Sequence, residues 1–409
     1  MKILPFIFVS LACLGCRTVP TEKTPGTSTT EVGLPDATLV KNNNRFAFEL
    51  YNNIGSEPQN MFCSPYSISA ALAMTYTGAR EKTEKQMNDV FHFGTNDQTL
   101  YNKYHALFNY INGLNAGDIL NIYTANSIWA QKDFKFKTAF VDNIKNSFNS
   151  EVKTVDFIKE TEKCRTDINA WVEQQTNQKI KDLIQPHILD DLTRLVLVNA
   201  IYFKAAWDMP FDVKATKKID FYTDETTKIT TDFMVADNTY KLYQGDTYKA
   251  IELPYGKGKM SMLLILPNSK TGLKELQKNL NVDFYNDLET KLASAKAKLY
   301  LPKFNTSSAF ELSEVLKKMG MPEAFTDNAD FSGMTGRKDL KISKVIHKTF
   351  INVDEAGTEA AAATAVVVRM KSVLVNMVEF KFDHPFMFII KENTYNSVLF
   401  AGNIYNPTK

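Results

Sequence analysis

The segment VDEAGTEAAAATAVVVRMKSV at residues 353–373 combines two opposed structural preferences. Its run of alanines at 360–363 favours a short helix on intrinsic propensity. Gly357 interrupts the start of such a helix, and the β-branched residues at 366–368 favour a strand. We therefore interpret the segment as a potential strand, with a short alanine helix as the alternative.

Read with the two-residue period of a strand, this segment has one face without charge. That face contains small or apolar residues and two threonines: Thr358, Ala360, Ala362, Thr364, Val366, Val368 and Met370. All the charges lie on the other face, which consists of Glu359, Ala361, Ala363, Ala365, Val367, Arg369 and Lys371. Such a strand can pack one face on a core and turn the other to solvent. It ends in RMKS at 369–372, a basic sequence that trypsin-like proteases cleave.

The composition of the chain is that of an ordinary globular protein, with 44% hydrophobic and 23% charged residues among 409. A net charge of +2 gives no general attraction to nucleic acid or to an anionic membrane. Cys63 and Cys164 are too far apart for a disulfide framework and are expected to be free, buried thiols. No His and Cys cluster has metal-ligand spacing, so we predict neither a metal nor a cofactor.

The first residues are typical of an export signal. In 1–16, MKILPFIFVSLACLGC, Lys2 precedes an apolar stretch too short to span a bilayer. The Gly-Cys ending resembles a bacterial lipobox, in which Cys16 would be acylated; cleavage near Ala12 without a lipid is the alternative. Residues 17–36, rich in Thr, Pro and Gly, are expected to be a flexible spacer. The protein is thus expected to be an outer-membrane or cell-surface lipoprotein, or else secreted or periplasmic.

Residues 37–409 show no composition break and are interpreted as a single α+β domain. Apolar residues four apart, Phe46, Leu50 and Ile54, predict a first helix, and Ser64 is placed to cap a second at 65–77. Further helices are predicted at 168–184 and 310–319. Strands are predicted at 120–130, 195–207, 250–253, 260–267, 297–304, 373–382, 386–391 and 397–404, with a hairpin between the third and the fourth.

Five motifs, in order, resemble the serpin family over nearly all of the chain after the spacer. They are FCSPYSIS (62–69), LVNAIYFKAAW (197–207), HKTFINVDEAGTEA (347–360), EAGTEAAAAT (355–364) and FKFDHPFMFII (380–390). The resemblance implies a serpin fold: three β-sheets, about eight or nine helices, and an exposed reactive-centre loop at about 355–376.

The resemblance also implies a mechanism. A protease cleaves the loop and is held as an acyl-enzyme, while the freed loop inserts as a new strand in the large sheet. The protein would be an irreversible suicide-substrate inhibitor of serine proteases, with cysteine proteases also open, and would not be an enzyme. The uncharged face favours insertion, because burying a charge there would oppose it. A non-inhibitory binding or carrier protein is the alternative.

The resemblance places the cleaved bond fourteen residues after the hinge glycine, at Lys371-Ser372, with Arg369-Met370 as the rival. The partner would be a trypsin-like protease, although the valines at 366–368 also suit elastase-like enzymes. No nucleic-acid partner is expected, membrane contact only through the lipid, and the protein is expected to be a monomer. The implied loop hinge consists of Glu355, Gly357, Thr358, Glu359, Ala360, Ala361, Ala362, Ala363 and Thr364.

Two further residue groups follow from the resemblance. Ser64, Ser67, Asn199 and His347 match a shutter, a buried hydrogen-bonded group under the large sheet that lets its strands part and reclose. The alternative is ordinary core residues with satisfied hydrogen bonds. At the breach, where the loop first enters the sheet, the resemblance places Trp207 together with an ion pair between Lys303 and Glu355.

Overall fold

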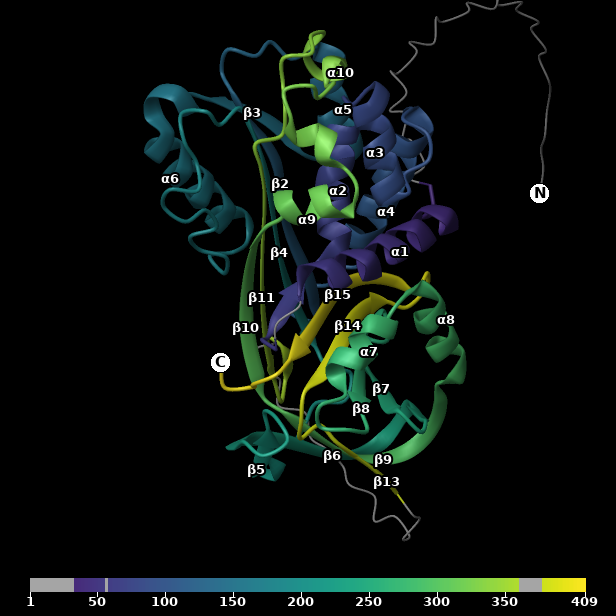
Figure 1. Ribbon diagram of the computed structural model, residues 1–409. Coiled ribbons are helices and arrows are strands. Elements are labelled where there is room, and N and C mark those ends of the chain that lie inside the picture. The colour runs from purple at the N-terminus through teal and green to yellow at the C-terminus, as the bar shows by residue number, and fades with distance from the viewer. Residues whose placement is uncertain (1–32, 56–57, 360–376) are drawn as a thin grey trace, which may run out of the picture. The chain divides into compact units, whose positions relative to one another are not determined.

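The computed structural model describes residues 33–55, 58–359 and 377–409 (Figure 1). The predicted signal, the spacer up to residue 32, and the loop residues 360–376 therefore lie outside the described residues. Within the described ranges, no helix is long and apolar enough to cross a membrane. The same ranges contain no group of His, Cys, Asp and Glu side chains that could hold a metal ion.

Ten α-helices and two short 3-10 helices occur in the described part of the chain. The α-helices are α1 (Ala37–Ile54), α2 (Pro65–Tyr76), α3 (Glu81–Phe91), α4 (Gln98–Gly113), α5 (Thr138–Phe148), α6 (Phe157–Gln175), α7 (Leu273–Asn279), α8 (Val282–Lys291), α9 (Ser313–Met319) and α10 (Ser332–Thr335). The 3-10 helices are η1 (Val213–Ala215) and η2 (Pro322–Phe325). The prediction of about eight or nine helices is close to this number.

Fifteen strands in these ranges form two sheets. The six-stranded sheet has the order β10 (Phe304–Glu311), β11 (Lys344–Asp354), β12 (Gly357–Thr358), β4 (Leu195–Ala206), β2 (Leu120–Gln131), β3 (Glu151–Val155). The nine-stranded sheet has the order β1 (Met61–Cys63), β15 (Ser397–Ile404), β14 (Phe386–Glu392), β8 (Met260–Pro267), β7 (Tyr248–Tyr255), β6 (Lys228–Gln244), β9 (Ala293–Pro302), β13 (Val378–Lys381), with β5 (Lys217–Tyr222) paired to β6.

Strand β6 explains why two sheets are found where three were predicted. It has 17 residues and pairs with β5 along its first part, with β9 along its middle and with β7 at its end. Its hydrogen bonds therefore join all of these strands into one sheet. The mixture of helices with largely antiparallel sheets confirms the α+β class.

The six-stranded sheet has helices on both faces (Figure 1). Helix α6 covers the face on which Tyr202 and Ile346 lie, in a cluster with Phe157 and Ile168 of the helix. Helix α2, buried along its whole length, packs under the opposite face. A strand that enters this sheet must therefore fit between two packed layers.

The start of α2 forms as the sequence predicted. Ser64 has an extended backbone and its hydroxyl accepts a hydrogen bond from the amide of Ser67, while Pro65 fills the first helical position. The predicted strands at 120–130 and 195–207 appear as β2 and β4, and β7 with β8 forms the predicted hairpin. Cys63 and Cys164 are free and buried, as predicted, and burial raises the pKa of the Cys63 thiol to about 12.

The helix predicted at 168–184 is wrong at both ends. Helix α6 begins at Phe157, because Asp156 caps it by accepting from the amide of Lys159, and it ends at Gln175. The backbone then adopts positive φ at several positions that no helix tolerates: Asn177, Gln178 and Asp182. The apolar residues that suggested helix there belong to the connection from α6 to β4.

The region around residue 303 also differs from the prediction. The single strand predicted at 297–304 is two strands, β9 and β10, with Lys303 between them where the chain passes from one sheet to the other. The helix predicted at 310–319 begins only at Ser313, because Phe310 pairs with His347 as part of β10. Of the strand predicted at 373–382, residues 373–376 lie outside the described residues, and the rest appears as β13 at Val378–Lys381.

Candidate functional site: the seam of the six-stranded sheet

Strands β4 and β11 lie side by side and pair directly, in parallel, from Lys344 opposite Val196 to Phe350 opposite Tyr202. We call this line of pairing the seam. Strand β12, only two residues long, separates β4 from β11 at one end of the seam. In the described residues, the strand between β4 and β11 is therefore two residues long.

At the hinge, position 357 has no room for a side chain. Gly357 pairs with Ala206 of β4 and Asp354 of β11, and its φ of 151° lies in the region that side chains rarely adopt. A Cβ at this position would lie 2.1 Å from the carbonyl oxygen of Ala205. Only glycine lets the chain turn back into the sheet at this point.

Thr358 lies on the inner face of the sheet, as the two-residue period predicted. It is fully buried opposite Ala205, and its hydroxyl is 2.6 Å from the phenol oxygen of Tyr255 on β7. Glu355 and Gly357 are buried as well. The prediction of an exposed loop beginning at about 355 is therefore wrong for these residues, because the hinge is already folded into the sheet.

The predicted breach residues come together around this hinge. The ring of Trp207 stacks on Tyr255 with centroids 4.1 Å apart, and its indole nitrogen donates to the carbonyl oxygen of Asp354 at 2.9 Å. Lys303 Nζ lies 2.8 Å from Glu355 Oε2, and the hydroxyl of Thr216 donates to Glu355 Oε1 at 2.7 Å. Burial alone would raise the pKa of Glu355, but these hydrogen bonds lower it below its usual value.

The predicted shutter residues meet beneath the seam. Asn199 of β4 and His347 of β11 are direct partners in the strand register, and Asn199 Oδ1 is hydrogen-bonded to His347 Nδ1. Asn199 also donates to the carbonyl oxygen of Ser67, at 2.9 Å, and the amide of Ser64 donates to His347 Nε2, at 3.1 Å. Any separation of β4 from β11 must break the side-chain bond between Asn199 and His347.

The protonation of His347 follows from these partners. Its Nε2 accepts from a backbone amide, so Nδ1 carries the proton and donates to Asn199. Burial lowers the pKa of His347 to about 3. The imidazole is therefore neutral at physiological pH.

Sequence reasoning missed several partners of these residues. Asn126 of β2 accepts from Asn199 and extends the shutter by one strand. Tyr255 supports both Trp207 and Thr358 from the other sheet. Asn126 has the only amide side chain in TANSIWA (124–130), and that amide was a usable signal; Tyr255 offered none.

Glu359 is the last described residue before the loop, and its contacts were also missed. Its Oε2 accepts from the phenol of Tyr202 at 2.7 Å and lies 2.7 Å from Lys179 Nζ. The remaining predicted hinge and bond residues lie outside the described residues: Ala360, Ala361, Ala362, Ala363, Thr364, Arg369, Met370, Lys371 and Ser372. The same holds for Cys16.

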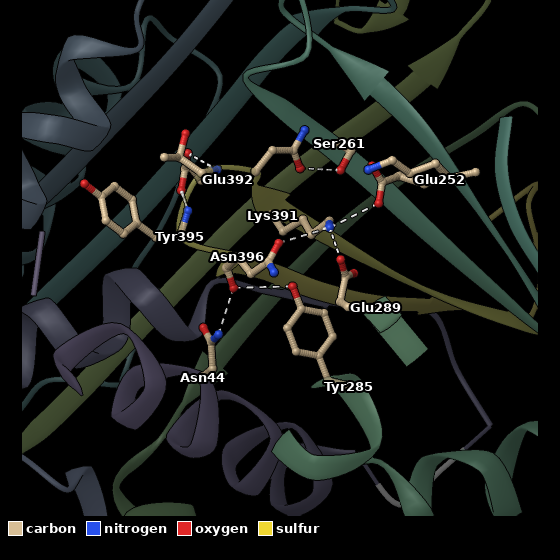
Figure 2. A network of polar contacts seen from close by, with 12 residues as sticks. Asn44, Glu252, Ser261, Tyr285, Glu289, Lys391, Glu392, Tyr395 and Asn396 are labelled. Atoms are coloured by element: carbon tan, nitrogen blue, oxygen red, sulfur yellow. Dashed lines mark hydrogen bonds and ion pairs between the residues drawn. The ribbon is translucent and has the colours of Figure 1, made fainter. Parts of the chain in front are cut away.

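A second polar cluster lies on the nine-stranded sheet, away from the seam. Figure 2 shows Lys391 between two carboxylates: its Nζ pairs with Glu289 of α8 and lies 3.1 Å from Glu252 of β7. Lys391 also donates to Asn396. Burial raises the pKa of Glu289, although the Lys391 ammonium opposes that rise. The cluster ties β14 to α8 and β7, beside a cavity of about 650 Å³.

Comparisons with known proteins agree with this geometry. The model of the family described as "Serpin (serine protease inhibitor)" matches residues 41–407. The chain belongs to the serpin family. A serpin-like protein of Methanosarcina mazei is 37% identical, over 90% of this chain and 87% of its own length. The leukocyte elastase inhibitor of Xenopus tropicalis is 36% identical, over 88% of this chain and 97% of its own.

A solved structure extends the likeness to the fold. Human thyroxine-binding globulin, in complex with its hormone, has a TM-score of 0.81 and 31% identity, covering 91% of this chain and 99% of its own. The serpin fold predicted from the five motifs is therefore confirmed.

Proposed function

We propose that this serpin inhibits trypsin-like serine proteases as a suicide substrate. The serine oxygen of the protease attacks the carbonyl carbon of Lys371, and the peptide bond to Ser372 breaks. The new amino group leaves, and an ester joins the protease to Lys371. The freed hinge then carries the bound protease as it enters the seam, before water can hydrolyse the ester.

The observation that supports this proposal best is the strand pairing at the seam. Strands β4 and β11 pair directly, and Gly357 and Thr358 already occupy the first two places of a strand between them. A longer strand continues from there in a defined register. From residue 358 to residue 370, the face of the segment that contains Thr358 carries no charge. These inward-facing side chains can therefore be buried at little cost in free energy.

Insertion is expected to be effectively irreversible. Each backbone hydrogen bond contributes on the order of 1 kcal/mol, and a strand of about a dozen residues between two neighbours adds many. While the loop is uncut, the chain continues from both of its ends. The loop therefore cannot enter the sheet as a full-length strand and form these bonds. Cleavage removes that constraint, and the new strand then stabilises the sheet.

The proposal is tested by mixing the protein with trypsin and separating the products on a denaturing gel. A band at the summed mass of the two proteins, resistant to heating in detergent, is expected. Lys371→Ala should abolish this band and Arg369→Ala should leave it, so the pair of variants assigns the bond. The opposite pattern would move the bond to Arg369, and complete cleavage of the wild-type protein without any complex would contradict inhibition.

A carrier function is the second candidate. It is favoured by the cavity of about 650 Å³, which is within the range of small-molecule sites, and by the likeness to thyroxine-binding globulin. However, two carboxylate oxygens of its lining are not free for a ligand: Glu252 Oε2 pairs with Lys391, and Glu289 Oε1 is shielded from solvent. They cannot contact a ligand without a rearrangement, so we favour inhibition.

We also propose that the protein is exported and tethered through a lipid on Cys16. Support comes from the sequence alone: a basic start, a short apolar stretch and a Gly-Cys ending. Intact mass of the mature protein tests this. An N-terminal cysteine with the added mass of acyl chains is expected, whereas a mature chain that begins near residue 13 without added mass would contradict the tether.

A further inference from the structure

Glu359 is held by two groups from different parts of the chain. Its carboxylate lies 2.7 Å from Lys179 Nζ and accepts from the phenol of Tyr202, also at 2.7 Å. The Glu359 side chain is only 11% exposed, and that of Lys179 is 41% exposed. A carboxylate this well buried depends on its partners, because an unpaired buried charge is costly.

Lys179 belongs to the connection between α6 and β4, which is fastened to both sides of the seam. Lys179 contacts the hinge and lies 6.0 Å from the ring of Tyr202 on β4. On the other side, Lys348 of β11 donates its Nζ hydrogen to the carbonyl oxygen of Lys181 at 2.6 Å. Insertion of a strand moves β4 and β11 apart by about 4.8 Å. The connection cannot keep both attachments when that happens.

The backbone of Glu359 ends the strand at this point. Its φ of 51° is left-handed, and its amide donates to the carbonyl oxygen of Asn352 at 3.0 Å. To lengthen β12, this residue must become extended. The carboxylate then leaves its present position, so the first step of insertion itself breaks the contact with Lys179.

The strand register identifies the next partner. Gly357 lies opposite Ala206 and Thr358 opposite Ala205, so an extended residue 359 lies opposite Lys204. Lys204 is on the same face as Tyr202, two residues along β4. Its present partner is weak: Asp118 is 95% exposed, and the two charged atoms are 3.4 Å apart.

We propose that Glu359 is a two-position ionic latch. While β12 ends at Thr358, Glu359 pairs with Lys179. This ion pair holds the α6–β4 connection at the seam. When the strand lengthens, Glu359 passes to Lys204 and the connection is released. The first position stands on the intact structure alone, and the second rests on the proposed function.

The first position is tested by hydrogen exchange of the intact protein. Lys179→Met should raise the exchange rate about fivefold in peptides covering 176–190 and 352–359, because one partly exposed ion pair is lost. Lys163→Met is the matched control: it removes an exposed ion pair with Asp167 on α6 and should leave these rates unchanged. Equal rates in Lys179→Met and wild type would overturn the latch.

A double-mutant cycle makes this test specific to the pair. Glu359→Gln keeps an acceptor for Tyr202 but removes the charge. If Lys179 acts through Glu359, adding Lys179→Met to Glu359→Gln should change exchange very little. If the two effects multiply, to about 25-fold, the residues act independently and the proposal fails.

The second position is tested on protein cleaved in the loop. Lys204→Met should lower the melting temperature of the cleaved form while leaving that of the intact form nearly unchanged. An equal effect on both forms would overturn the transfer to Lys204. If cleavage does not stabilise the wild-type protein at all, the proposed function fails together with the second position, whereas the exchange result still decides the first.

Discussion

His347 shows how one buried side chain can control the seam. It is fully buried, pairs across the seam with Asn199 and accepts from the amide of Ser64, the cap of α2. Protonation would place a hydrogen on Nε2. Two hydrogen-bond donors, Nε2 and the amide of Ser64, would then face each other. The neutral imidazole is therefore part of the closed seam, and a charged imidazole would oppose it.

This residue predicts a pH dependence of stability. The folded pKa of His347 is about 3, against 6.5 for an ordinary histidine, so between these values the unfolded chain binds the extra proton. The stabilisation is complete above pH 6.5 and is lost as the pH falls towards 3. At pH 4.5 the loss is about 3 kcal/mol of unfolding free energy.

Urea unfolding at pH 7.5 and at pH 4.5 measures this loss. His347→Gln should be less stable than wild type at pH 7.5 but should show a smaller decrease on acidification. His105→Gln, on α4, is the control and should behave as wild type. An unchanged pH dependence in His347→Gln would contradict the assignment.

At the scale of an element, the proposed function makes β12 the start of a longer strand. Thr358 replaces solvent contact with complete burial and a bond to Tyr255, while Gly357 permits the close approach to Ala205. Thr358, the first residue of the predicted uncharged face, is thus already buried in the sheet. What the period of the sequence could not indicate is how far this strand enters the intact sheet.

Thr358→Arg tests this element. A charged side chain cannot be buried opposite Ala205, so the hinge should leave the sheet and the strand should not lengthen. Trypsin is then expected to cleave the variant without forming a stable complex. Thr358→Val is the control, because it keeps the shape and loses only the bond to Tyr255, at a cost of about 1 kcal/mol. Complex formation by Thr358→Arg at the wild-type yield would show that this position does not enter the sheet.

The sequence predicted elements and site residues unequally, for physical reasons. Ser64, Asn199 and His347 were identified together because the motifs that contain them are local and distinctive. Lys179, Tyr202 and Tyr255 were missed, because their roles depend on contacts across the fold that leave no local pattern. The helix predicted at 168–184 was misplaced for a related reason: its apolar spacing serves the packing of a connection, not of a helix.

At the scale of the whole molecule, the proposed mechanism implies that the intact fold is incomplete. The six-stranded sheet holds two residues of a strand that has a register and an uncharged face for many more. Within the described residues, β4 and β11 pair directly beyond these two residues, so no longer strand lies between them. The stability of the intact fold should be limited by the loop, which cannot supply the remaining hydrogen bonds until it is cut.

The melting temperature before and after cleavage of the loop tests this claim most directly. About a dozen new backbone hydrogen bonds, each on the order of 1 kcal/mol, should raise the melting temperature of a chain of this size by on the order of 15 °C. Calorimetry of the intact and the cleaved protein, with the fragments confirmed by mass, measures this shift. An equal or lower melting temperature after cleavage would contradict insertion of the loop into the seam.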